Sequence, residues 1–485
     1  MKSLLAFLCA AAAVATLTAL TACGSKKQDA AHNTPRDSTF TSLTQPEWSR
    51  NAVIYEVNWR QMTPEGTIAG VENQLGRLKE LGVDILWLMP VHPISEVDRK
   101  GTLGSYYAVK DYTALNPELG TLDDFRRFTD RAHALGMKVV IDWVPNHSGR
   151  DNAWVTQHPD WYKRNEQGEM FGPYDWTDVY EFDYSVPQMR QAMTDAMTFW
   201  LTEMDVDGFR CDVADHVPTD FWEEARPKLD AAKEGGVFML AESSNPDLNR
   251  HAFNMSYNWP MKDVFNAIAQ TAGYNTHRPK EGQERDYGTA YPQAIDSLLA
   301  LQDTLFPKDS YLMNMITNHD LNSWEGTEFE RLGTLTPAFA VLSWTLPGMP
   351  LIYTGQETGM NRAFEFFEKD TPPAFEPRNE YFHFYSKLNH LKHTQSALRA
   401  GVEGAPVNRL PTANPSIYAF ERRDDNSHVV VIVNLGNRPA EVEFTGPAPQ
   451  VDGPEWIDFF NNTRAELPHS LNPGQYTVLI KRPGN

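Results

Sequence analysis

Residues 121–147 read TLDDFRRFTDRAHALGMKVVIDWVPNH and predict one helix followed by one buried strand. Thr121 and Asp124 have the spacing of a capping box, which satisfies free N–H groups at a helix start. Gly136 is placed to end the helix, and residues 138–143 are apolar enough for a strand buried on both faces. The helix has one apolar face, formed by Leu122, Phe125, Phe128 and Leu135. A helix that leads into a buried strand is the repeating unit of parallel α/β folds.

The same unit recurs along the chain on both sides of this stretch. Strand candidates lie at residues 53–57, 85–90, 138–143, 208–212, 237–241, 256–259, 313–317 and 351–354. Helical faces lie between them, such as Ile68, Val71, Leu75, Leu78 and Leu81 before Gly82. Eight buried strands separated by helices predict an α/β fold of the (β/α)8, or TIM barrel, type. The segment of about 147–183 is too long and aromatic for a simple loop, so we expect a short inserted lobe after the third strand.

The pattern changes near residue 397. Residues 417–421 and 429–433 flank a polar turn and predict a hairpin, and 442–444 and 476–480 are further strand candidates. We therefore expect the barrel and its lobe to span residues 46–396. A small C-terminal antiparallel β-domain should span residues 397–485.

The N-terminal segment has the features of an export signal. Lys2 is followed by an apolar run from Leu4 to Leu20 and then by Leu20-Thr21-Ala22-Cys23. The last four residues resemble the lipobox of bacterial lipoproteins. On this interpretation residues 1–22 are a lipoprotein signal peptide, Cys23 is lipidated and residues 23–45 are a flexible tether. The alternative is an ordinary signal peptide with an incidental cysteine.

A lipid at Cys23 would attach the protein to a membrane of the cell envelope. Gly24 follows the cysteine in place of the Asp that is associated with inner-membrane retention. In a Gram-negative cell this favours an outer-membrane or periplasm-facing lipoprotein.

Composition narrows the classes of partner. The chain has 485 residues, 41% hydrophobic and 12% aromatic, so it should fold around a large core. Its formal net charge of −21 argues against a nucleic-acid partner, because binding a phosphate backbone requires clustered Lys and Arg. Of the three cysteines, only Cys211 lies in the predicted body, so we expect no disulfide there and a buried packing role for Cys211.

Four of the predicted strands end in polar segments that contain acids. One acid after a strand is more often a cap or an ion-pair partner than part of a site. In a closed barrel, however, the C-terminal strand ends face one cup, so acids from four strands meet there. The segments are Asp142-Trp-Val-Pro-Asn146-His147, Gly208-Phe-Arg210-Cys-Asp212, Met239-Leu-Ala-Glu242 and Thr317-Asn-His319-Asp320.

These residue types favour acid/base and nucleophilic chemistry without a catalytic metal, because no HExxH-type metal motif accompanies them. In glycoside hydrolysis one carboxylate attacks the anomeric carbon while another, with a raised pKa, protonates the leaving oxygen. Arg210 lies two residues before Asp212 on the same strand face, and its charge is expected to keep Asp212 ionised. Apolar residues precede Glu242, which favours a raised pKa and the acid role.

The four segments resemble the conserved regions of the α-amylase family, glycoside hydrolase family thirteen, in order and strand position. The resemblance spans about residues 53–365. It implies that Asp212 is the nucleophile, Glu242 the general acid/base and Asp320 a residue that binds sugar hydroxyls and stabilises the transition state. It further implies sugar contacts by Tyr107, His147 and His319, orientation of Asp212 by Arg210, and support of the site by Asp142.

The chain also departs from the family pattern. Many α-amylases have Lys-His three and four residues after the nucleophile, where this chain has Asp215 and His216, which puts binding of the leaving group in doubt. Leu321 after Asp320 is apolar where many relatives are polar, and we expect it to narrow the cleft. Asn146 corresponds to a calcium ligand in calcium-dependent members, so structural calcium and a loop-bracing hydrogen bond remain alternatives. Other ligands are unassigned, with Asp175, Asp178 and Asp183 as candidates.

The resulting prediction is a lipid-anchored retaining glycosidase that cleaves α-1,4 bonds of starch, glycogen or maltooligosaccharides, with no cofactor for its chemistry. Within the same family, a transglycosylase or a hydrolase preferring α-1,6 bonds or short oligosaccharides remains open. A non-catalytic surface glucan-binding protein is a further alternative. The sequence leaves the oligomeric state open.

Overall fold

The computed structural model describes residues 43–275 and 285–482. The predicted signal peptide, the lipid site at Cys23 and most of the predicted tether lie outside the described residues. Gln45, at the start of the described chain, is already buried, and its amide donates to the carbonyls of Asn254 (3.0 Å) and Asp309 (2.9 Å).

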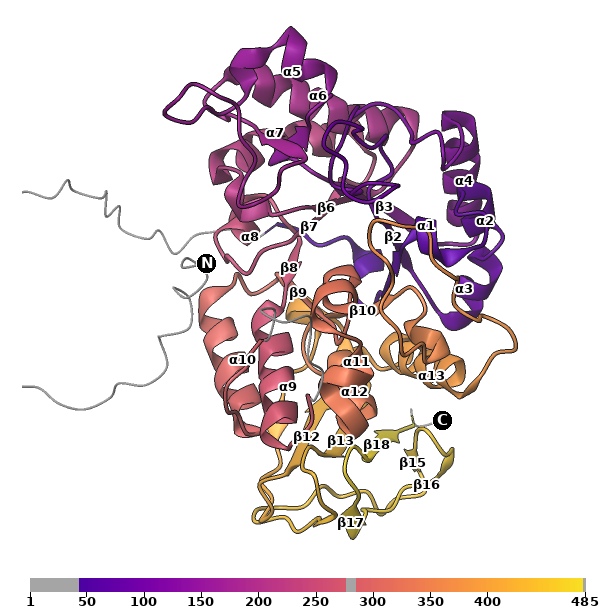
Figure 1. Ribbon diagram of the computed structural model, residues 1–485. Coiled ribbons are helices and arrows are strands. Elements are labelled where there is room, and N and C mark those ends of the chain that lie inside the picture. The colour runs from indigo at the N-terminus through magenta and orange to yellow at the C-terminus, as the bar shows by residue number, and fades with distance from the viewer. Residues whose placement is uncertain (1–42, 276–284, 483–485) are drawn as a thin grey trace, which may run out of the picture. The chain divides into compact units, whose positions relative to one another are not determined.

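The predicted barrel is confirmed. All eight of its strands pair in parallel and close in the order β1-β10-β9-β8-β7-β6-β3-β2 (Figure 1). The strands are almost completely buried, because helices cover the outside of the barrel and side chains fill its interior. The strands are β1 (Ile54–Val57), β2 (Ile85–Leu88), β3 (Lys138–Trp143), β6 (Gly208–Cys211), β7 (Phe238–Ala241), β8 (Met255–Tyr257), β9 (Tyr311–Asn314) and β10 (Met349–Tyr353).

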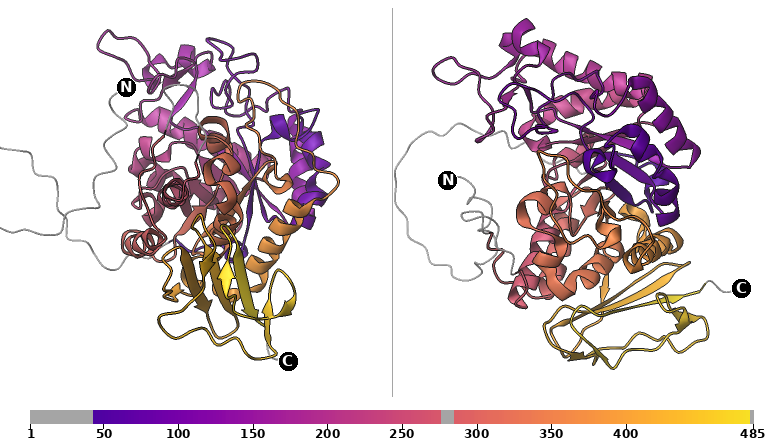
Figure 2. Two further views of the ribbon diagram at one scale, coloured as in Figure 1. Left: turned by 60° about the horizontal axis from the view of Figure 1, so that its bottom comes forward. Right: turned by 45° about the vertical axis from the view of Figure 1, so that its right-hand side comes forward.

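Helices surround the strands in both views of Figure 2. The longest helix among the described residues is α6 (Pro187–Glu203), whose methionines pack into the core. The other helices are α1 (Trp59–Met62), α2 (Ile68–Glu72), α3 (Leu75–Leu81), α4 (Leu122–Ala134), α5 (Ala153–Gln157), α7 (Thr219–Ala232), α8 (Leu248–His251), α9 (Trp259–Thr271), α10 (Gln293–Leu305), α11 (Glu328–Leu332), α12 (Thr336–Thr345) and α13 (Glu380–Thr394).

The capping residues act as the sequence predicts. Thr121 and Asp124 form the reciprocal capping box at the start of α4. Gly82 ends α3 with φ of +94°, and its N–H donates to the carbonyls of Leu78 and Lys79. The single helix expected over 68–81 is wrong, because Asn73 and Gln74 separate α2 from α3, although both helices turn their apolar residues to one core.

The last two strands begin two residues earlier than the sequence predicts. The prediction followed the apolar residues Met315 and Ile316, which are buried but lie beyond the end of β9. These residues belong to the loop that carries His319 and Asp320, so burial continues past the strand into the loop. Apolar periodicity therefore located the strand but not its end.

A small lobe follows β3. Its antiparallel pair β4 (His147–Gly149) and β5 (Val179–Glu181) aligns His147 with Glu181, and α5 lies between the two strands along the chain. Tyr162 and Phe182 pack together within it, with ring centroids 4.9 Å apart. The lobe thus continues directly from the end of a barrel strand.

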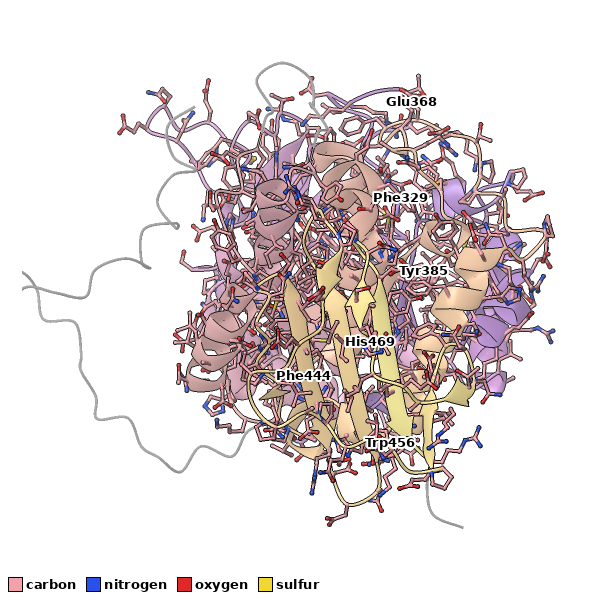
Figure 3. All side chains as sticks on the ribbon, turned by 90° about the horizontal axis from the view of Figure 1, so that it is seen from below. Phe329, Glu368, Tyr385, Phe444, Trp456 and His469 are labelled. Carbon is pink, nitrogen blue, oxygen red and sulfur yellow. The ribbon has the colours of Figure 1, made fainter. Side chains whose placement is uncertain are left out.

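The predicted C-terminal antiparallel β-domain is confirmed as a six-stranded sheet in the order β11-β12-β13-β18-β15-β16. Its hairpin pairs β12 (Ile417–Arg423) with β13 (His428–Asn434), and β18 (Tyr476–Lys481) pairs with β13 (Figure 3). The strand expected at 442–444 is wrong, since Phe444 makes only an isolated bridge to Thr412. The remaining strands are β11 (Asn408–Arg409), β14 (Ala440–Glu441), β15 (Trp456–Asp458), β16 (Thr463–Arg464) and β17 (Ser470–Leu471).

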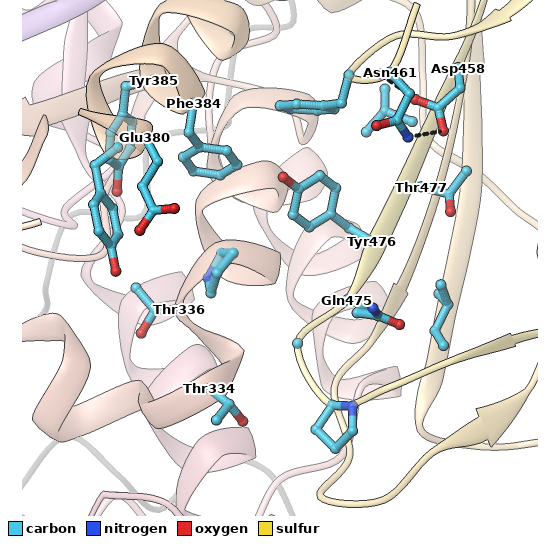
Figure 4. Close-up of a pocket in the computed structure, with 17 residues that line it drawn as sticks. Thr334, Thr336, Glu380, Phe384, Tyr385, Asp458, Asn461, Gln475, Tyr476 and Thr477 are labelled. Carbon is cyan, nitrogen blue, oxygen red and sulfur yellow. Dashed lines mark hydrogen bonds between the residues drawn. The ribbon is translucent and has the colours of Figure 1, made fainter. Parts of the chain in front are cut away.

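This domain packs on α12 and α13. The buried guanidinium of Arg422 donates to the carbonyls of Thr345 (3.0 Å) and Ala405 (2.8 Å). At the same junction, a cavity of about 760 Å³ is lined by Phe384 of α13 and by Tyr476 of β18 (Figure 4). In residues 43–275 and 285–482, no helix combines the length and apolarity that crossing a membrane would require.

Candidate active site

Arg210, in β6, is the centre of the acidic cluster. Its side chain is fully buried, and Nη1 donates to Asp142 Oδ1 and to Asp212 Oδ1, each at 2.9 Å. Nη2 lies 2.9 Å from Glu242 Oε2, and Nε donates to the hydroxyl of Tyr257 at 3.0 Å. One guanidinium therefore holds three carboxyl groups from the ends of β3, β6 and β7.

Glu242 is positioned by backbone as well as by charge. Its Oε2 accepts a hydrogen bond from the N–H of Val213 at 2.8 Å. Val213 follows Asp212 and has φ of +36°, an unusual conformation for a β-branched residue. This turn aims an N–H at the neighbouring strand end, so the backbone after Asp212 helps fix Glu242.

A second chain of contacts joins β1 to β3 through a histidine. His319 Nδ1 contacts Glu56 Oε1, and His319 Nε2 lies 2.8 Å from the hydroxyl of Tyr107. The hydroxyl of Tyr107 also donates to Asp142 Oδ2 at 3.1 Å. Asp320 Oδ2 is 3.3 Å from His319 Nε2. Asp142 thus links this chain to Arg210.

These groups surround a cleft of about 610 Å³ at the C-terminal ends of the barrel strands. Six of the sequence-predicted residues line it: Tyr107, His147, Asp212, Glu242, His319 and Asp320. Asp142 and Arg210 lie fully buried behind them. The larger cavity of Figure 4 contains none of the predicted residues, so we place the candidate site in this cleft.

Asp212 and Glu242 have different pKa values, and burial is the main cause. It raises the pKa of Asp212 to about 6 and that of Glu242 to about 8, with Arg210 opposing the rise in both. Asp212 is therefore mostly ionised at neutral pH while Glu242 is mostly protonated. Arg210 acts on Asp212 in the expected direction, since it lowers the pKa of that carboxyl, but burial has the larger effect and the net pKa is raised. Two carboxyls with different pKa values suit a nucleophile and an acid.

The two histidines of the cleft, His147 and His319, have different charge states. Burial lowers the pKa of His147 to about 3, so its ring is neutral and can accept as well as donate a hydrogen bond. Burial also lowers the pKa of His319, but Asp320 and Glu56 more than offset this and raise it to about 9. His319 is therefore cationic at neutral pH.

Asn146 and two of the candidate calcium ligands have partners within the protein. The Asn146 amide nitrogen lies 3.4 Å from His147 Nδ1, which supports the loop-bracing alternative. Asp178 pairs with Lys100 at 3.2 Å, and Asp183 accepts from the N–H of Ser185. No group of three His, Cys, Asp or Glu side chains suited to a metal ion occurs in the part of the chain that the structure describes.

The structure also locates the residues that depart from the family pattern. His216 contacts the hydroxyl of Tyr174, from the lobe, at 2.9 Å through Nε2. The expectation that Leu321 narrows the cleft is wrong: its side chain is fully buried, and Trp324 of the same turn lines the cleft instead. Trp176 also lines the cleft, whereas Trp143 is buried in the core, as is Cys211.

Sequence reasoning missed several residues of the site. Glu56 lies within an otherwise apolar strand, and that isolated charge was the only available signal. Trp87 Nε1 donates to Asp142 Oδ2 at 3.2 Å, although a tryptophan in a buried strand suggests packing alone. Phe366 and Phe367 come from a loop without periodicity and reach the cleft through the fold.

Two family descriptions match the chain. Residues 32–373 match "Alpha amylase, catalytic domain", and residues 407–473 match "Maltogenic Amylase, C-terminal domain". The first match covers most of the chain and contains every cleft residue named above.

Individual relatives agree with these matches. Alpha-amylase MalA of Haloarcula japonica is 28% identical over 82% of this chain and 57% of its own length, so the chain spans little more than half of that relative. Neopullulanase 2 of Thermoactinomyces vulgaris is 26% identical over 90% of this chain and 79% of its own length. Among solved structures, an alpha-amylase from Lactobacillus plantarum is 30% identical, with a TM-score of 0.76 over 89% of this chain and 99% of its own.

Proposed function

The chain belongs to the α-amylase family of glycoside hydrolases, and on that premise we propose that it cleaves α-1,4-glucosidic bonds of starch, glycogen or maltooligosaccharides with retention of configuration. The observation that carries the proposal is the pair Asp212 and Glu242 on one guanidinium, one mostly ionised and the other mostly protonated. Retaining enzymes need two such carboxyls roughly 5–5.5 Å apart.

In the first step Asp212 Oδ attacks the anomeric carbon while Glu242 donates its proton to the departing glycosidic oxygen. The bond to the leaving sugar breaks, and an ester forms between the anomeric carbon and Asp212. In the second step Glu242, now ionised, takes a proton from water, whose oxygen attacks the same carbon and releases Asp212. Because each step inverts the carbon, the product keeps the α configuration.

The remaining cleft residues bind and orient the sugar. Asp320 is partly exposed at the cleft wall, where its carboxylate can accept hydrogen bonds from sugar hydroxyls. His147 offers a neutral ring, His319 a charged one, and Tyr107 an aromatic face that can stack on a pyranose. Arg210 and Asp142 orient Asp212 from below, without reaching the cleft.

The experiment is incubation of residues 24–485 with maltoheptaose while product sizes and anomers are followed. Shorter α-anomeric products alone support the proposal, and products longer than the substrate would move the assignment to a transglycosylase. No cleavage of maltoheptaose would direct the assay to α-1,6-linked substrates. Binding without any product would favour a glucan-binding protein.

Asp212→Asn tests the nucleophile within the same assay. It should abolish nearly all hydrolysis and leave the fold intact, because Asn keeps the shape but cannot form the ester. Asp220→Asn is a matched control, since Asp220 is exposed and pairs with Arg190 on the outer surface. Wild-type turnover in Asp212→Asn would overturn the assignment.

We further propose that Cys23 carries the lipid that attaches the protein to the cell envelope, in the outer membrane if the cell is Gram-negative. The support is the segment Leu20–Cys23 after a basic and apolar leader. Cys23→Ser should release the protein from the membrane fraction or leave it unprocessed. Membrane retention of a processed Cys23→Ser protein would contradict lipidation.

A further inference from the structure

Glu56 is a buried carboxyl group that the reaction scheme above does not use. Its side chain is fully buried in β1, between Tyr55 and Val57. Its backbone carbonyl accepts hydrogen bonds from Thr354 N at 3.1 Å and Thr354 Oγ1 at 2.7 Å, which fix it to the end of β10. The position of Glu56 is therefore set by the barrel itself.

Within the described chain, the carboxyl group of Glu56 has one hydrogen-bond partner. Its Oε1 contacts His319 Nδ1, while Oε2 has no hydrogen-bond partner among the described residues. A buried carboxylate is costly unless a cation compensates it. His319 is the side chain placed to do so.

The other nitrogen of His319 indicates its protonation state. Tyr107 has a single hydroxyl proton, and it donates that proton to Asp142 Oδ2. The contact of 2.8 Å between His319 Nε2 and the same hydroxyl then requires Nε2 to be the donor. Nδ1 faces Glu56 Oε1; burial raises the pKa of Glu56, and His319 and Arg210 oppose that rise. With Glu56 ionised, Nδ1 is the donor in this contact, and both ring nitrogens carry protons.

We propose that Glu56 is a positioning residue that holds His319 as a doubly protonated cation with its Nε2–H directed at Tyr107 and the sugar-binding face of the cleft. This inference rests on the proposed function. Tyr107 and Asp320 are the groups on that face, so a rotated or neutral His319 would change the positions and hydrogen bonds that both offer to the sugar.

The surroundings of His319 support a cation held in place. Asp320 and Glu56 raise its pKa against the effects of burial and of Arg210, and the net result is about 9. The ring of Trp87, from β2, packs edge-on with centroids 5.9 Å apart, and Tyr107 stacks at 5.5 Å. Glu56 from β1 is thus one of two carboxylates facing the imidazole, and the only one of the two that is fully buried.

The test compares Glu56→Gln with Glu357→Gln. Glu357 is a matched control: it is also a fully buried carboxyl beside β1, but its partners are Arg77 Nη2 at 2.7 Å and the Tyr55 hydroxyl at 2.8 Å. Histidine labelled with ¹³C at Cε1 allows His319 to be titrated by NMR, with its resonance identified by its absence in His319→Gln. This readout needs no substrate.

In the wild type the His319 resonance should titrate near pH 9. In Glu56→Gln it should titrate at least about one pH unit lower, because an opposite charge in contact typically shifts a pKa by about 1–3 units. Glu357→Gln should titrate as the wild type does. Because His319 then loses its proton at lower pH, kcat/KM of Glu56→Gln should fall more at pH 8 than at pH 6, about twofold more for a shift of one unit and about tenfold more for two units.

An unchanged His319 titration in Glu56→Gln would overturn the proposal. If Glu56→Gln does not fold, the wild type still decides, because a His319 that is neutral at pH 7 contradicts the inference without any variant. Glu56→Asp, which keeps the charge, should then retain the high titration. A wild type that cleaves no glucan would refute the proposed function while leaving the NMR result to judge Glu56.

Discussion

Replacing Arg210 with methionine should move the whole pH profile of the enzyme, not only lower it. Methionine fills similar space but removes the charge, the hydrogen bonds to Asp142 and Asp212, and the ion pair with Glu242. The three carboxyls would then share a buried site without their common cation. They can relieve their repulsion only by binding protons.

The size of the shift follows from the contacts. In the wild type, burial raises the pKa of Asp212 to about 6 although Arg210 opposes it. A cation in contact typically lowers a carboxyl pKa by about 1–3 units, so its loss should place the pKa of Asp212 at about 7–9. At pH 7 the ionised fraction of Asp212 then falls from about nine-tenths to between about one-half and about one-hundredth. This loss alone lowers kcat/KM by about 2-fold to 100-fold.

The assay is kcat/KM for a chromogenic maltooligosaccharide from pH 5 to pH 10. In the wild type the acid limb should lie near pH 6 and the alkaline limb near pH 8. Both limbs should move to higher pH in Arg210→Met. Arg190→Met, which removes a surface arginine paired with Asp220 and Glu224, should leave them in place. If Arg210→Met lowers kcat/KM but both limbs stay at their wild-type pH values, the electrostatic argument is refuted.

Three further outcomes are expected. Glu242→Gln should slow the cleavage of maltooligosaccharides by about 10²–10⁴-fold but leave the cleavage rate of α-maltosyl fluoride largely unchanged, because its leaving group needs no proton. An equal loss on both substrates would contradict the acid role. The melting temperature should fall from pH 5 to pH 8.5, because Asp212 and Glu242 have folded pKa values above their ordinary ones and His319 loses its stabilising proton as pH rises through about 9. Glu242→Gln should reduce that fall, and a calorimetric scan showing no reduction would count against this linkage. Gly474→Ala should destabilise the protein by about 2 kcal/mol or more, because the new Cβ would lie 1.8 Å from the Thr334 carbonyl at a φ of +72°, and an unchanged denaturant midpoint would exclude that close approach.

The barrel could be predicted because its evidence is local. Thr121, Asp124 and Gly136 mark the ends of a helix within a few residues of themselves, and each buried strand is a short apolar run. The same locality explains the errors. Met315 and Ile316 are as buried as strand residues, yet they lie in the loop after β9, and no neighbouring residue distinguishes the two cases.

The candidate site could be predicted where its residues follow strands in sequence. Asp212 and Glu242 were found because a barrel brings all its strand ends together. Glu56 was not, because its partner His319 is 263 positions away, on a loop after a strand that does not pair with β1. A charge inside an apolar strand signals only that some partner exists, and the closed strand order is needed to identify it.

The charges of the site bear on the transition state of the proposed reaction. Glu56, Asp142, Asp212, Glu242 and Asp320 share the end of the barrel with two cations, Arg210 and His319. Burial is the largest cause of the raised pKa of Glu242, and the charges of Asp212 and Asp320 add to it. Because carboxyl groups outnumber cations here, the empty cleft is destabilised by an excess of negative charge. A neutral sugar does not relieve that excess. The transition state for glycoside cleavage carries positive charge at the anomeric carbon, so the field that is unfavourable in the empty cleft stabilises the reacting sugar more than the bound substrate.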